Sequence, residues 1–163
     1  MRTRLFLPVL LFTLMPRPAL LQCQQVTVEN ETGKQVQLAR ADLEALPHIK
    51  VTVTTGSTGA SAAFEGIALG TLLAKAGVGL GETLRGKRMA SCLLVEAADG
   101  YRAVIALPAL DPTFTDKQIV LAFLKDGKPL GDKEGPYRIV IPDEKRMARW
   151  VRQVTVLKIV DVQ

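Results

Sequence analysis

The chain has 163 residues, of which 21 are Lys or Arg and 16 are Asp or Glu, so its net charge is +5. This length is typical of one compact domain, and 48% hydrophobic against 23% charged residues excludes an intrinsically disordered chain. Two cysteines exclude a disulfide scaffold, and a single histidine with so few cysteines excludes a zinc site built from Cys and His.

The first 23 residues have the form of a secretory signal peptide. Arg2 and Arg4 precede an apolar run over residues 5–15, which is shorter than the roughly 20 residues of a membrane-spanning helix. We therefore expect an exported, periplasmic protein whose mature chain is residues 24–163. The alternatives to ordinary cleavage are a lipid anchor at Cys23, although the small residue expected before it is missing, and an uncleaved anchor.

The leader also carries much of the positive charge. Arg2, Arg4 and Arg17 lie within it, and without these three the 21 basic residues fall to 18, a net charge of +2 against the same 16 acids. This small excess, with aromatic residues at only 5%, argues against a partner made of nucleic acid.

The first half of the mature chain predicts a hairpin, a further strand and two short helices. Alternating residues 25–29 and 35–38 flank a turn at residues 30–34, a helix over residues 39–46 buries Leu43 and Leu46, and Pro47 ends it. Residues 48–55 alternate as a strand. The small residues at 56–62 are either a loop that lines a pocket or a flexible connection, and a second helix over residues 69–76 ends at Gly77.

The second half predicts mainly strands. Residues 92–97 and 101–107 flank an Asp-Gly turn and form a second hairpin, and further strands are expected at residues 118–124, 137–141 and 154–162. Cys92 lies in the strand predicted over residues 92–97 and is interpreted as an inert buried thiol, with a disulfide to Cys23 as the alternative. Many strands with two short helices, and no composition break, predict a single α+β domain with a mostly antiparallel sheet over residues 24–163.

Three features are candidates for chemistry before any resemblance is considered. His48 lacks the Gly-x-Ser-x-Gly pattern of a nucleophile turn, so a structural role is favoured. Residues 56–61 lack the Gly-Lys-Ser/Thr ending of a phosphate loop, and a connection is favoured over an anion site. The basic stretch at residues 145–152, around Trp150, either binds a small anionic ligand such as a phosphate ester or is simply a solvated face.

A series of short motifs resembles the molybdopterin-binding domain of the sulfite oxidase family over about residues 25–160. In chain order the motifs are FEGIAL (64–69), LL (72–73), AGV (76–78), ADGY (98–101), DGKPL (126–130), GPYRIVIP (135–142) and RWV (149–151). The resemblance implies the α+β sulfite oxidase fold and a pocket for a pterin that carries a phosphate. The cofactor is otherwise unknown, and molybdopterin is the one that the resemblance implies.

The resemblance transfers two cofactor-binding residues to this chain. Arg138 lies in the Pro-x-Arg segment, and Arg149 is the basic residue directly before Trp150. Lys133 stands where the family has a His, and residues 55–61, where the family has the Cys that holds molybdenum, contain no Cys. Because a hydroxyl is a poor substitute for a thiolate, no metal ligand and no catalytic residue are assigned.

Two functions follow as hypotheses. The preferred one is a non-catalytic binding or partner module that keeps the molybdopterin-binding fold, and the alternative is a periplasmic molybdopterin-dependent oxidoreductase or a subunit of one; a purely structural role is the third. We expect no haem or dimerisation domain in a mature chain of this length, so electron transfer would need a separate redox or membrane partner protein.

Overall fold

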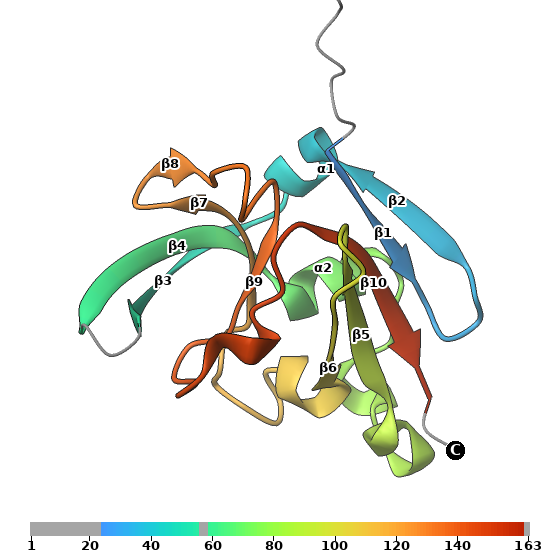
Figure 1. The fold of residues 1–163 in the computed structure, drawn as a ribbon. Helices are drawn as coiled ribbons and strands as arrows, with labels where there is room; N and C mark the ends of the chain where they lie inside the picture. The colour runs from blue at the N-terminus through green and yellow to red at the C-terminus, as the bar shows by residue number, and fades with distance from the viewer. Residues whose placement is uncertain (1–23, 56–58, 162–163) are drawn as a thin grey trace, which may run out of the picture.

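The computed structural model describes residues 24–55 and 59–161, and the predicted signal peptide, with Cys23, lies outside this part of the chain. Its regular structure consists of strands and short helices in two sheets (Figure 1). The helices are α1 (Arg40–Glu44) and α2 (Leu69–Lys75), with 3-10 helices at Gly81–Thr83, Gly86–Ala90, Leu107–Leu110 and Met147–Arg149. The strands are β1 (Gln25–Glu29), β2 (Gln35–Ala39), β3 (His48–Thr55), β4 (Ala60–Ala68), β5 (Cys92–Ala97), β6 (Arg102–Ala106), β7 (Val120–Lys125), β8 (Lys128–Pro129), β9 (Arg138–Val140) and β10 (Val154–Val160).

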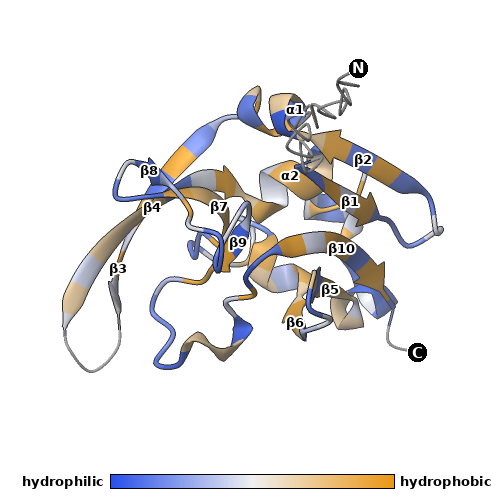
Figure 2. Cartoon of the chain, turned by 45° about the horizontal axis from the view of Figure 1, so that its top comes forward, coloured by the Kyte–Doolittle hydropathy of each residue, from blue (hydrophilic) through white to orange (hydrophobic). Residues whose placement is uncertain are grey.

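The first sheet has the strand order β2-β1-β10-β5-β6. The hairpins β1–β2 and β5–β6 are both antiparallel, and β10 lies between them, parallel to β1 and antiparallel to β5. Burial alternates along β1 and β5, so one face of the sheet packs on the core. Figure 2 shows this alternation as bands of apolar and polar residues along β1 and β2.

The second sheet has the order β3-β4-β7-β8, and β9 also pairs with β7. The first four residues of β7 and all three residues of β9 are buried. A register shift between Glu65 and Gly66 marks a bulge where β4 meets β7. Because β9 is followed closely by β10, residues 141–153 connect the second sheet to the middle of the first.

Helix α2 lies between the two sheets in Figure 1. Its residues Leu69, Leu72 and Leu73 have no exposed surface and belong to one buried apolar cluster that draws on both sheets. Gly77, with φ of +83°, takes the left-handed conformation that ends such a helix. Among the described residues there is no helix with the length and apolarity that a membrane span requires.

The α+β class and both hairpins are confirmed, and Asp126 and Gly127, with φ of +50° and +76°, form the turn between β7 and β8. Three predictions need correction. Residues 60–62, expected in a loop or connection, begin β4, while residues 56–58 lie outside the described part. Helix α1 ends at Glu44, which leaves Leu46 only partly buried. The last strand, predicted over residues 154–162, ends at Val160, and it lies in the middle of its sheet.

Cys92 is also placed differently from the prediction. It is a free thiol with intermediate exposure at the start of β5, and its side chain lies on the outward face of the first sheet, opposite to the buried Leu93. It is therefore not the buried core residue that the apolar sequence around it predicts. The alternative, a disulfide to Cys23, involves a residue outside the described range.

Candidate functional site

The first residue of β9, Arg138, carries the cationic group at the centre of the candidate site. It pairs with Ala122 of β7, and only 7% of the residue is exposed. Its guanidinium carbon lies 5.5 Å from the ring centre of Phe64 and 5.3 Å from that of Trp150, both within the range of a cation–π contact. The two rings are 6.1 Å apart and almost perpendicular, so they enclose the guanidinium on two sides.

A carboxylate of the same chain already binds this guanidinium. The Nη1 group of Arg138 donates to Oε1 of Glu134, and Nζ of Lys125 lies 3.7 Å from Oε2 of the same side chain. Lys125 also lies 5.7 Å from the Phe64 ring. We call Phe64, Lys125, Glu134, Arg138 and Trp150 the Arg138 cluster.

Burial governs the electrostatics of the Arg138 cluster. Removal from water lowers the pKa of Arg138 below its usual value, and the nearby Arg152 lowers it further, while Glu134 partly opposes both effects. Because a buried cation without a counter-ion is strongly destabilising, the Glu134 carboxylate is the group that compensates the buried charge of Arg138.

Two polar donors of the Arg138 cluster are left over. Nε of Arg138 and Nε1 of Trp150 are buried and have no acceptor in the described part of the chain. A buried donor without an acceptor costs about 1–3 kcal/mol of stability, so an acceptor placed at either atom would be stabilising. However, both are covered by protein, and no ligand reaches them unless the cluster opens.

Arg149 occupies a different environment from Arg138. It is the last residue of the 3-10 helix Met147–Arg149, and 49% of its side chain is exposed. Both Nε, at 2.9 Å, and Nη2 donate to Oε1 of Glu144. Each predicted cofactor-binding arginine is therefore paired with its own glutamate, and one arginine is buried while the other is exposed.

A small pocket of about 270 Å³ lies beside Trp150. Its lining includes Tyr101, Met147 and Arg152, but neither Arg138 nor Arg149. Tyr101 and Met147 are 49% and 40% exposed. The structure thus does not bring the two predicted arginines into one shared pocket here, and it exposes apolar side chains beside a cation instead.

Cys92, the one thiol among the described residues, lies far from the Arg138 cluster along the strands of the first sheet. Cys92 pairs with Val160 at one end of β10, whereas Tyr137, which precedes Arg138, bonds to Val154 at the other end. The six steps between Val154 and Val160 correspond to about 20 Å of strand. No group of three His, Cys, Asp or Glu in residues 24–55 and 59–161 is placed to hold a metal ion. The buried Arg138 is moreover already paired with a carboxylate, that of Glu134.

The remaining sequence candidates have structural positions. Nδ1 of His48 lies 3.7 Å from Glu65, and its ring meets Phe123 edge-on at 5.0 Å. Lys133 is exposed in a turn. Sequence reasoning missed the roles of Phe64, Lys125 and Glu134; the only signal was the placement of Glu134 four residues before Arg138, which is meaningful in a helix but not in a turn that leads into a strand.

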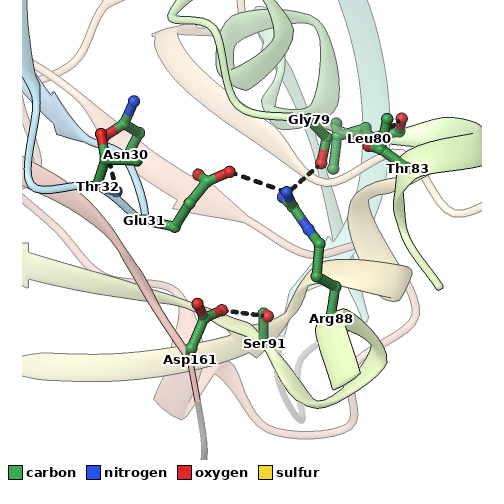
Figure 3. A network of polar contacts seen from close by, with 9 residues as sticks. All are labelled: Asn30, Glu31, Thr32, Gly79, Leu80, Thr83, Arg88, Ser91 and Asp161. Atoms are coloured by element: carbon green, nitrogen blue, oxygen red, sulfur yellow. Dashed lines mark hydrogen bonds and ion pairs between the residues drawn. The ribbon is translucent and has the colours of Figure 1, made fainter. Parts of the chain in front are cut away.

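A second polar network has a structural role (Figure 3). Arg88 donates to Glu31 at 2.9 Å and to the carbonyl of Gly79 at 3.0 Å, and Ser91 donates to Asp161 at 2.5 Å. These contacts join the segment after α2 to the β1–β2 turn and to the end of β10. A Cβ atom at position 79 would lie 2.7 Å from the Thr83 hydroxyl, so a larger residue there would force the Thr83 side chain to shift.

Comparison with known proteins agrees with this fold. The family model of the oxidoreductase molybdopterin binding domain matches residues 15–162, nearly the whole chain. Among solved structures, the sulfane dehydrogenase SoxCD from Paracoccus pantotrophus is similar, with a TM-score of 0.65 and 21% sequence identity. The match covers 85% of this chain but only 38% of the SoxCD chain, so this chain spans well under half of that length. No curated protein is similar enough to count as a match.

Proposed function

Because the chain belongs to the oxidoreductase molybdopterin binding domain family, as its resemblance to the sulfite oxidase family predicted, we propose that it is a non-catalytic binding or partner module built on that fold. It holds no molybdenum through a cysteine of its own. Since one fold hosts many functions, the proposal depends on the site and not on the family alone.

The position of the only described thiol carries this proposal. Cys92 lies about 20 Å of strand away from the neighbourhood of Arg138, on the outward face of the first sheet. Residues 55–61 contain no Cys in the sequence. A metal that prefers soft thiolate donors therefore lacks one next to the cationic group that would hold its pterin.

We place the module outside the cytoplasm, as an exported periplasmic protein, on the charge and apolar pattern of residues 1–15. The exposed Tyr101 and Met147, with Arg152 beside them, are the surface that we propose for a redox or membrane partner protein. A small anionic ligand would contact exposed cations such as Lys145 and Arg152, and not the enclosed Arg138.

The alternative function is a molybdopterin-dependent oxidoreductase or a subunit of one. The observation in its favour is the pair of buried donors without acceptors, Nε of Arg138 and Nε1 of Trp150, because a bound ligand could supply those acceptors. It would require molybdenum to be retained without a nearby protein thiolate.

Molybdenum content separates the two functions. The mature protein is purified from its native host, metal per chain is measured by mass spectrometry, and pterin is measured by fluorescence after oxidation. We expect neither molybdenum nor pterin in the folded protein. Stoichiometric molybdenum would overturn the non-catalytic proposal, and a Cys92→Ala variant, assayed in parallel, would then show whether this thiol binds the metal.

A further inference from the structure

Glu134 occupies the position in which Arg138 would bind an anionic ligand. We infer that its carboxylate acts as an internal anion that closes the cationic position of this fold to phosphate-bearing ligands. The inference deepens the proposed function and rests on it, since it explains why a domain that keeps this arginine binds no phosphorylated pterin there.

The contacts of Glu134 are those that a phosphate group would make. One carboxylate oxygen accepts from Arg138 on β9, and the other lies 3.7 Å from the ammonium of Lys125 on β7. A single anion thus joins two cations from neighbouring strands, which is the arrangement that favours charge-assisted binding of an oxyanion. With Glu134 in this position, Arg138 and Lys125 both already have an anionic partner.

Burial shows which side of the guanidinium is closed by the carboxylate. The rings of Phe64 and Trp150 lie against Arg138, whose side chain is 9% exposed, whereas the side chain of Glu134 is 27% exposed. Glu134 is therefore the more accessible member of the ion pair. A ligand in solution would have to displace this side chain to reach the guanidinium.

Phosphate titration of variants tests the inference. Trp150 is the only tryptophan of the chain and lies 5.3 Å from the Arg138 guanidinium, so its fluorescence reports locally on this position. We expect no saturable change when inorganic phosphate is added to the wild-type protein. In Glu134→Ala we expect a saturable change, with an apparent affinity at least tenfold above the detection limit that the wild-type titration sets, and its loss in Glu134→Ala combined with Arg138→Ala.

The matched control is Glu82→Ala. Glu82 is exposed in the 3-10 helix Gly81–Thr83, and its substitution makes the same change of residue type and net charge away from the Arg138 cluster. It should titrate like the wild type. A wild-type response that Arg138→Ala abolishes, or a folded Glu134→Ala variant without a gain in phosphate binding, would overturn the inference.

The inference remains testable if Glu134→Ala does not fold in ordinary buffer. Phosphate should then restore folding by providing the missing anion, as measured by far-UV circular dichroism, and failure to restore it would count against the inference. This test and the molybdenum test of the proposed function can fail independently of each other. Molybdenum in a protein whose wild-type form ignores phosphate would end the proposed function alone, whereas a metal-free wild type that binds phosphate through Arg138 would end this inference alone.

Discussion

The phenol of Tyr137, the residue before Arg138 in the chain, is almost fully buried, and its hydroxyl donates to the carbonyl of Gln24 at 3.1 Å. Burial raises the pKa of Tyr137 to about 12, above the ordinary value of 10.0. The folded state therefore retains this proton longer than the unfolded state, and stability that is complete below pH 10 is lost as the pH rises toward 12.

A Tyr137→Phe variant measures this loss. We expect the wild type to lose about 1.4 kcal/mol of stability relative to the variant between pH 9 and pH 11, because each unit of pKa difference corresponds to about 1.36 kcal/mol. Urea unfolding of both proteins at the two pH values gives the difference directly. Equal losses in the two proteins would show that Tyr137 titrates normally when folded.

Asp111 is a buried carboxylate with the opposite pH dependence. Burial on its own raises its pKa, but the hydrogen bonds from Thr113 and from the Gly81 N–H together lower it below the ordinary 3.8. The folded state binds the proton less readily than the unfolded state, so the stability from this carboxylate is complete above about pH 4 and declines as the pH falls through the folded pKa.

Replacement of Asp111 by Asn should destabilise the protein by about 1–3 kcal/mol at pH 7, because an amide presents one acceptor oxygen to three donors. The stability difference between the two proteins should shrink at pH 3, because below about pH 3.8 the unfolded wild-type chain takes up a proton at this carboxyl more readily than the folded protein does. Urea unfolding at pH 7 and pH 3 measures both quantities. A difference that stays constant with pH would mean that the charge of Asp111 has no part in its effect.

At the scale of the elements, strands β4 and β7 of the second sheet lie very close to each other at Gly66. A Cβ atom at Gly66 would lie 2.1 Å from the carbonyl oxygen of Leu121 and 2.6 Å from Cα of Ala122, both in the backbone of β7. Since backbone atoms cannot move aside as a flexible side chain can, only glycine fits here. The close packing of β4 on β7 therefore explains the glycine of the FEGIAL motif.

We expect Gly66→Ala to destabilise the protein by about 3 kcal/mol or to prevent folding, which is at or above the upper end of overpacking costs. Gly131→Ala is the control, because a Cβ atom there has no neighbour within 4 Å and should change stability by less than about 0.5 kcal/mol. Thermal unfolding of the three proteins checks both values. A stable Gly66→Ala variant would mean that β4 and β7 can separate without cost.

The elements also show where sequence patterns are sufficient. Both hairpins could be predicted because alternation and an Asp-Gly turn are local signals. Strand β4 was not predicted, because the small residues of ASAA and the glycine at position 66 have little β propensity, and pairing on both sides compensates for this. The central place of β10 was equally hidden, since its partner β1 is more than a hundred residues away.

At the scale of the whole molecule, the candidate site likewise could be predicted only in part from the sequence. The identities of Arg138 and Arg149 follow from short motifs, but their pairing with Glu134 and Glu144 depends on how residues 131–153 cross between the two sheets. That crossing also places Trp150 against Phe64 of β4, while Val151 accepts a hydrogen bond from β9. The Arg138 cluster and the apolar core therefore share residues, and a substitution in one should alter the packing of the other.

Leu157 tests whether the two sheets unfold as one unit. It is fully buried in β10, opposite Val28 of β1 and Val95 of β5, so Leu157→Ala should cost about 2–5 kcal/mol. Because one apolar cluster includes residues of both sheets, Trp150 fluorescence and far-UV circular dichroism should give the same lowered urea midpoint. Val104→Ala, at a 53% exposed position on β6, should leave that midpoint nearly unchanged. Separate midpoints for the two signals in Leu157→Ala would instead show that the second sheet, with the Arg138 cluster, stays folded when the first has been lost.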